Sequence, residues 1–227
     1  NPDGSEAWTY ERTDAELCSL SAAWGKIVAT YKTGVGCGDT VAIDAATGEY
    51  DSTRSAINSD EVVPISSNDR VGTVSTDRID LWRSDLVRTV EYGKPDVPVN
   101  PGVQPRSGCT IGSALPAGAS IAVLEACPTE PFPRLTVIGA SPKEAAEPQE
   151  TSSVVSPDLG AAAPEGAERA RLITATANGA VVYVPAQDGR PARVTSVDPQ
   201  GRTIRSVDVT TGPGGAPRDV PVVTEAG

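Results

Sequence analysis

The residues best suited to chemistry in this chain are its four cysteines, Cys18, Cys37, Cys109 and Cys127. An even number of cysteines in two similarly spaced pairs favours disulfides. Zinc binding would require closely spaced Cys-x-x-Cys pairs or histidine. The chain has no such pair and no histidine at all. Four buried thiols in a reducing compartment remain the alternative.

Two expected hairpins would position these cysteines. A tight turn between two short strands folds Cys109 opposite Cys127. Residues Leu17–Tyr31 form a second hairpin, and the glycine-rich loop after it brings Cys37 back to Cys18. We therefore predict the disulfides Cys18–Cys37 and Cys109–Cys127. Such bonds persist in oxidising compartments, so an extracytoplasmic location is expected.

Other residues offer weaker chemistry. Asp77, Asp80 and Asp85 could supply oxygen ligands for calcium, but arginines alternate with them. This pattern is more typical of an exposed strand face with alternating charge. The stretch Gly34–Asp39 resembles a phosphate-binding loop, but no helix is expected after it. Without histidine the common triads and bases are also excluded. No catalytic, cofactor-binding or metal-binding residue is assigned.

The composition indicates an all-β chain. The 227 residues include 22 glycines and 20 prolines, too many for a helical bundle. The net charge is −11 and the isoelectric point is near 4.5, which argues against a nucleic-acid partner. No apolar run is long enough to span a membrane, so this segment is not expected to cross one.

Strand pairs repeat along the chain. The strongest hairpin turn is Asn178–Gly179, which suits a type I′ turn. Asp44 and Asp198 precede glycine turns, where aspartate caps its own backbone. Four units of about four antiparallel strands follow one another at spacings typical of propeller blades. We predict a β-propeller, part of a larger ring, with blades near residues 17–55, 62–93, 109–140 and 171–210.

Several segments lie outside these units. Residues 6–12, with Trp8 and Tyr10 on one face, are expected to form an outer closing strand. Residues 220–227 are expected to begin a further blade. The segment Ser141–Glu168, rich in Ala, Pro, Glu and Ser, is expected to be a mobile surface loop. Open blade edges would favour self-association.

Two segments resemble a known family. Ala42–Tyr50 reads Ala-Ile-Asp-Ala-x-Thr-Gly-x-aromatic and resembles the repeat of PQQ-like (quinoprotein-type) β-propellers. Leu81–Gly93, followed by Pro105–Cys109, is similar to an actinobacterial envelope protein of that class. The resemblance implies a cell-envelope protein with a membrane anchor in its full-length form. Quinoprotein dehydrogenases of the class bind PQQ with calcium and carry adjacent cysteines, which this chain lacks.

We therefore expect a non-catalytic cell-envelope scaffold that binds another envelope protein and needs no cofactor. The proline-rich loop Lys94–Ser107 is the preferred contact region, with Lys94 and Arg106 as candidate partner-contact residues. The alternative is a propeller that binds a small ligand or the quinone PQQ and has oxidoreductase-type activity.

Overall fold

The computed structural model describes residues 3–34, 36–94, 103–161, 169–187 and 189–209. In these residues sixteen strands form four sheets, and each sheet has four antiparallel strands in sequence order. We call these sheets the first to fourth blades. The first blade contains β1 (Glu16–Ala23), β2 (Lys26–Thr33), β3 (Gly36–Asp44) and β4 (Tyr50–Ser55); the second β5 (Val63–Ser66), β6 (Val71–Val74), β7 (Arg78–Trp82) and β8 (Arg88–Gly93); the third β9 (Thr110–Ala117), β10 (Ser120–Ala126), β11 (Arg134–Gly139) and β12 (Glu150–Val155); the fourth β13 (Arg171–Thr176), β14 (Gly179–Val184), β15 (Arg193–Val197) and β16 (Thr203–Asp208).

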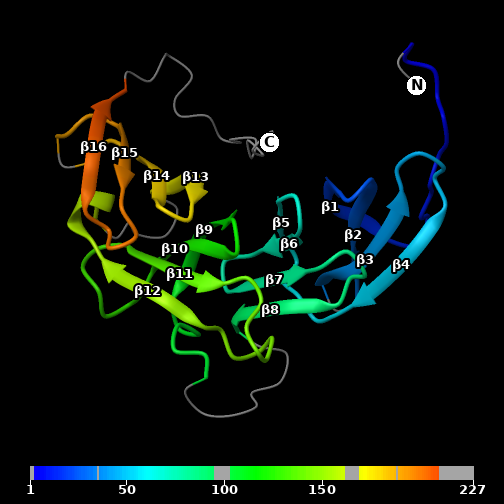
Figure 1. The fold of residues 1–227 in the computed structure, drawn as a ribbon, viewed down its shortest axis with the longest axis horizontal. Coiled ribbons are helices and arrows are strands. Elements are labelled where there is room, and N and C mark those ends of the chain that lie inside the picture. The colour runs from blue at the N-terminus through cyan, green and yellow to red at the C-terminus, as the bar shows by residue number, and fades with distance from the viewer. Residues whose placement is uncertain (1–2, 35, 95–102, 162–168, 188, 210–227) are drawn as a thin grey trace.

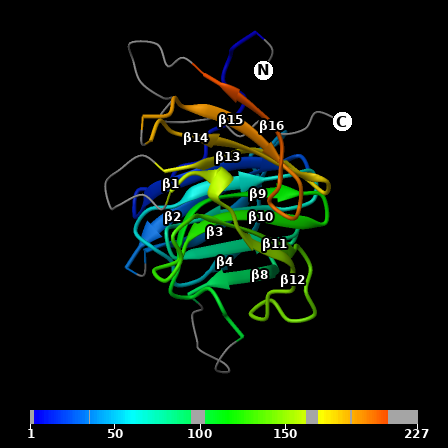
Figure 2. The same ribbon diagram turned by 90° about the vertical axis from the view of Figure 1, so that its left-hand side faces the viewer.

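The blades form an arc that is open on one side (Figure 1). The first strand of each blade lies on the inside of the arc and the fourth strand on the outside. The first blade ends one arm and the fourth blade ends the other; Figure 2 looks at the arc from the fourth-blade side. No helix among the described residues is long and apolar enough to cross a membrane. The predicted all-β fold of four four-stranded blades is confirmed.

Strand β10 shows how the sequence holds neighbouring blades together. Its Ile121 and Val123 pack toward the second blade, whereas Ala122 and Leu124 pack toward the fourth. All four side chains are buried. Because successive side chains point to opposite faces, a strand between two blades must be apolar on both. Each inner blade therefore has a core on either side.

The predicted turns are present, but the one between β13 and β14 is not of type I′. Ala177 and Asn178 lie between the paired residues Thr176 and Gly179, and neither has the positive φ that a type I′ turn requires. Gly179 begins β14 at a φ of 144°, and a Cβ there would lie 2.2 Å from the carbonyl oxygen of Val197. The Asp44 carboxylate accepts hydrogen bonds from the backbone N–H groups that follow it. These bonds, the one from Thr47 above all, lower the pKa of Asp44. Asp198 caps its turn in the same way.

The third blade is longer than the predicted range of 109–140. Its outer strand β12 lies inside the segment Ser141–Glu168 that was expected to be a mobile loop, and Val155 pairs with Arg134 of β11. An outer strand has a partner on one edge only and can be polar, so its sequence Glu-Thr-Ser-Ser-Val-Val lacked the apolar signal of a strand.

Residues 141–149 are also held in place rather than mobile. The carbonyl of Ala145 accepts a hydrogen bond of 2.8 Å from the backbone N–H of Glu91 on β8. The carbonyl of Ala146 accepts one of 2.8 Å from the side chain of Gln104. This segment covers the outer edge of the second blade, which explains its order. Residues 162–168 of the predicted loop lie outside the described residues.

The predicted outer strand at residues 6–12 is wrong in conformation. These residues form no strand, although they lie against the first blade. Trp8 and Tyr10 pack on the face of Tyr31, and the indole of Trp8 donates a hydrogen bond of 3.0 Å to the carbonyl of Ala45. The segment contacts a sheet face instead of an open strand edge, so no ladder of backbone bonds can form. The further blade predicted at 220–227 lies outside the described residues.

Both predicted disulfides are present. Cys18 bonds Cys37 and Cys109 bonds Cys127, and no cysteine is free. The first bond joins β1 to β3 across β2, and the second lies next to the paired ends of β9 and β10. Both therefore tie the inner strand of a blade to the rest of its sheet, and they indicate an oxidising environment.

We predict that each disulfide stabilises the fold by about 3 kcal/mol, since each closes a loop of roughly 20 residues. Replacing Cys109 and Cys127 by serine should lower the free energy of unfolding by this amount in urea titrations. Adding reductant to that variant should lower its stability further, because reductant breaks its remaining disulfide, Cys18–Cys37. Four thiols that can be alkylated in the unreduced native protein would contradict the prediction.

Candidate functional site

An arginine begins the third strand of three blades: Arg78 in β7, Arg134 in β11 and Arg193 in β15. The residue two positions later is polar in each case, namely Asp80, Thr136 and Thr195. By strand alternation both side chains point toward the preceding blade, the face that also carries Trp82, Ile138 and Val197. The repeated Arg-x-polar pattern is the sequence signal that marks this position.

In the second blade this position is a closed ionic cluster. Arg78 Nε lies 2.6 Å from Asp80, and Arg78 Nη2 lies 2.8 Å from Glu91. Arg88 Nε lies 3.0 Å from the second oxygen of Asp80. Burial raises the pKa of Asp80, and the guanidiniums of Arg78 and Arg88 oppose that shift. Two cations and two anions thus neutralise each other between the first and second blades.

The expected exposed face with alternating charge at Arg78 and Asp80 is therefore wrong. Asp80 is fully buried and Arg78 is 4% exposed. An inner blade has a neighbour on both faces, so charges on its third strand are buried and must be paired.

In the third blade the equivalent position surrounds Glu125 of β10. Its carboxylate accepts hydrogen bonds from the hydroxyls of Tyr92 at 2.9 Å and Thr136 at 2.6 Å. Burial raises the pKa of Glu125 and, together with the nearby Glu125 carboxylate, that of Tyr92. Arg134 forms a close ion pair with Glu130 and donates to Ser153. This cluster joins the second blade to the third.

The two candidate contact residues lie in different environments. The side chain of Lys94 is 74% exposed, with Nζ 3.9 Å from Asp77. The side chain of Arg106 is only 23% exposed, and its Nη2 contacts Glu150 at 3.4 Å. Arg106 Nε lies 4.0 Å from Glu125. The structure thus gives Arg106 an internal partner, and contact of either residue with another protein stays a prediction.

Gln104 fixes the described part of the loop that carries Arg106. Its buried side-chain amide donates to the carbonyl of Glu91 at 2.7 Å and accepts from the backbone N–H of Gly93 at 3.0 Å. Because the same amide also binds residue 146, it joins the second blade, the crossover and the third blade. Residues 95–102 of the predicted contact loop lie outside the described residues.

The fourth blade has an open groove at the equivalent position. The groove has a volume of about 400 Å³. Arg193 donates to the carbonyl of Asp158 at 3.1 Å, and the Asp158 carboxylate accepts from Thr203 at 2.7 Å. Neither Arg193 nor Arg190 pairs with a carboxylate among the described residues. The groove is lined by Asp158, Arg190, Pro191, Arg193, Thr195, Thr203, Ser206 and Asp208.

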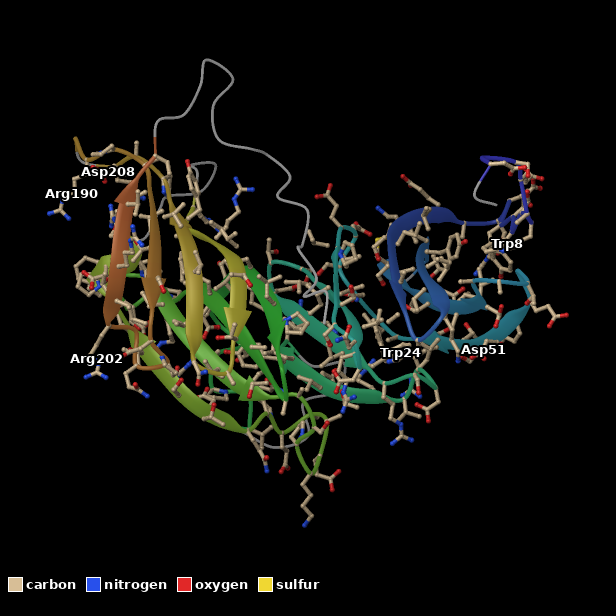
Figure 3. The ribbon with its side chains drawn as sticks, turned by 45° about the horizontal axis from the view of Figure 1, so that its top comes forward. Trp8, Trp24, Asp51, Arg190, Arg202 and Asp208 are labelled. Carbon is tan, nitrogen blue, oxygen red and sulfur yellow. A yellow bond between two sulfur atoms is a disulfide. The ribbon has the colours of Figure 1, made fainter. Side chains whose placement is uncertain are left out.

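Both charge signs are thus available in the groove. Arg190 and Asp208 lie at the same end of the fourth blade, and Arg202 lies at the other end (Figure 3). The hydroxyls of Thr195 and Ser206 are hydrogen-bonded at 3.0 Å between them. Such a surface can bind a charged or hydrogen-bonding segment.

The inner surface of the arc does not fit PQQ with calcium. This quinone is a tricarboxylate and needs convergent cations, whereas the four inner strands carry one arginine and one glutamate between them. Leu17, Leu20 and Val63 are instead exposed there. The part of the chain that the structure describes holds no group of three or more metal-ligating side chains.

Comparison with solved structures shows the fold. Hydrazine synthase of Kuenenia stuttgartiensis aligns with a TM-score of 0.53 and 11% identity over 91% of this chain and 53% of that one. The structure of U3-55K gives 0.52 and 11% over 89% and 54%. The WD40 repeats of RRP9 give 0.50 and 11% over 86% and 52%. WD40 repeats form propeller blades, so the predicted β-propeller is confirmed.

The chain spans just over half the length of these structures. No model of a known protein family matches the chain, and no curated protein sequence does. The resemblance to PQQ-like actinobacterial envelope proteins therefore stays a prediction beyond the propeller fold itself.

We predict that Arg106→Glu destabilises the protein by on the order of 2 kcal/mol, because it places a third carboxylate beside Glu125 and Glu150. Lys94→Glu, at an exposed position of the same loop, is the control and should change stability by about 0.5 kcal/mol or less. Urea unfolding of both variants measures the difference. Equal stability of the two variants would contradict an internal role for Arg106.

We also predict a pH dependence that belongs to Glu125. A carboxyl whose pKa is raised by folding holds its proton more tightly in the folded state, so its ionisation lowers stability as the pH rises above the ordinary value of 4.5. The stability of the wild type relative to Glu125→Gln should therefore increase as the pH falls from neutral toward 4.5. A constant difference across this range would contradict the prediction.

Proposed function

We propose that this protein is a non-catalytic interaction scaffold of the cell envelope that binds a protein partner through the groove of the fourth blade. The observation that carries the proposal is the contrast between three equivalent arginines. Arg78 and Arg134 are neutralised by carboxylates of their own chain. Arg193 opens into a groove of about 400 Å³ at the end of the arc.

The way the titratable groups are used also supports binding over catalysis. Asp80 and Glu125 are the most deeply buried carboxylates, and each is engaged by side chains of the adjacent strands. A general acid or base must reach a substrate, whereas these two carboxylates are buried and occupied by side chains of the chain itself. The groove, in contrast, is open, and its charged residues Asp158, Arg190, Arg193 and Asp208 present both signs.

The disulfides support the cellular location. Cys18–Cys37 and Cys109–Cys127 require an oxidising environment, as outside the cytoplasm. A rigid propeller that exposes grooves and loops there is suited to recognition, because loops and edges carry binding while the blades fix their position. We assign the partner to the same envelope compartment.

Site-specific photo-crosslinking in the source cells tests the proposal. A photoreactive residue at Thr203, in the groove, should give a discrete adduct with another protein. The same residue at the exposed Lys143, on the third blade, is the control and should give none. Absence of an adduct at Thr203, or equal adducts at both positions, would contradict binding through the groove.

A second arm tests catalysis directly. The purified protein, supplied with PQQ, calcium, alcohols or sugars and a redox dye, should reduce no more dye than a protein-free mixture. Turnover that depends on the protein would overturn the scaffold proposal in favour of an oxidoreductase.

A further inference from the structure

Strand β16 has an open outer edge. Two other outer strands are contacted by the following blade: the backbone N–H of Glu91 in β8 donates to the carbonyl of Ala145, and the hydroxyl of Ser156, directly after β12, donates to the carbonyl of Gly201. The outer strand β4 pairs with β3 only. In the described part of the chain only β15 pairs with β16. All six residues of β16 are exposed, including Ile204 at 65% and Val207 at 48%. An edge of this kind accepts a further strand.

The charge around β16 is opposite to that of the whole chain. Residues 189–209 contain four arginines and two aspartates, although the chain has a net charge of −11. Arg202 pairs with Asp198 at 2.8 Å. Arg190 and Arg193 line the groove together with Asp158 and Asp208, but neither arginine has a carboxylate within ion-pair distance among the described residues. Arg205 lies on the other side of β16, with Val207. The two groove arginines are therefore available to a carboxylate of a ligand.

The preceding blades show what an arginine at this position binds. Arg78 holds the carboxylates of Asp80 and Glu91, and Arg134 holds that of Glu130. Thr195 stands where blade two has Asp80, so Arg193 lacks the carboxylate that its own strand would supply. An incoming carboxylate would complete the same arrangement.

We propose that an extended acidic segment of the partner protein adds to the free edge of β16 as a fifth strand and places a carboxylate in the groove at Arg193 and Arg190. This inference rests on the proposed function and specifies its ligand. An added strand lies about 10 Å from β15, a gap that an arginine and a glutamate side chain bridge together.

The register of the fourth blade defines the sequence pattern of the ligand. Thr195 and Ser206 are paired on the groove side of the sheet, whereas Val194 and Val207 are paired on the other side. Successive side chains of an added strand alternate between these two sides. The ligand therefore alternates acidic residues, which face the groove, with β-branched apolar residues, which face Val207.

Fluorescence anisotropy with synthetic peptides tests this inference on the complete oxidised chain. The probe is a labelled peptide of three Val-Glu repeats, with a Val-Lys peptide of the same length as control. A third peptide carries N-methyl groups on alternate residues, which removes the backbone donors needed for strand pairing. The Val-Glu peptide should bind, and its affinity should fall with added salt. The Val-Lys and N-methylated peptides should bind at least tenfold more weakly.

Protein variants locate the site. Arg193→Gln and Arg190→Gln should each weaken binding of the Val-Glu peptide about tenfold. Arg54→Gln, on the exposed outer strand β4 of the first blade, is the matched control and should leave binding unchanged. Circular dichroism confirms that each variant is folded. Binding unaffected by Arg193→Gln, or equal binding of the N-methylated peptide, would overturn the proposal.

The outcomes separate this inference from the proposed function. A crosslinked partner at Thr203 with no peptide binding overturns the acidic-strand ligand but leaves the scaffold intact. Peptide binding without any crosslinked partner supports the ligand class and removes the proposed function. A dimer in sedimentation velocity that Ile204→Lys dissociates, with no peptide binding, overturns the proposal because a second copy occupies the edge.

Discussion

The structure depends on the requirement that each sheet bury two faces. A four-stranded blade is too thin to hold a core of its own, so stability comes from the junctions between blades. Ile121 and Leu124 of a single strand contribute to two separate cores. This constraint explains why short, apolar, β-branched segments suffice for a chain with one phenylalanine and no methionine. It also explains why the ends of the arc differ from its middle.

Two-sided burial also determines where charges can lie. On an inner blade a charged residue on the third strand is buried, and only a partner from the same or the adjacent blade makes that tolerable. Arg78 and Arg134 have such partners within their own blades, Glu91 for Arg78 and Glu130 with Ser153 for Arg134. At the fourth blade the junction is open at its outer side, so the equivalent arginine, Arg193, lines a groove instead of a closed ionic cluster. The first residue of the third strand is thus an arginine paired within its own blade in the second and third blades, and an arginine that lines an open groove in the fourth.

The features that could be predicted from the sequence are those that depend on residues close together along the chain, such as turns and hairpins. Turn chemistry located the turn between β13 and β14 at Asn178, although not its type, and hairpin geometry paired Cys109 with Cys127. The sequence did not predict that Asp80 is buried. Side chains alternate between the two faces of a strand in the same way whether a face contacts solvent or another blade. Strand β12 was missed since polar outer strands carry no apolar period. The groove depends on how the third and fourth blades separate at their outer edges, which no local pattern encodes.

The two ends of the arc differ in how far side chains of the chain itself cover them. At the first blade, Trp8 and Tyr10 cover the outer face, and Arg12 stacks over Tyr31 with its charge centre 4.9 Å from the ring while pairing with Asp39. That end is closed by aromatic contact and an internal ion pair. At the fourth blade no described segment does the same for β16, whose apolar and cationic side chains stay exposed. The described residues thus close one end of the arc with side chains of the chain itself and leave the other end exposed, and this asymmetry supports the proposed partner site at the fourth blade.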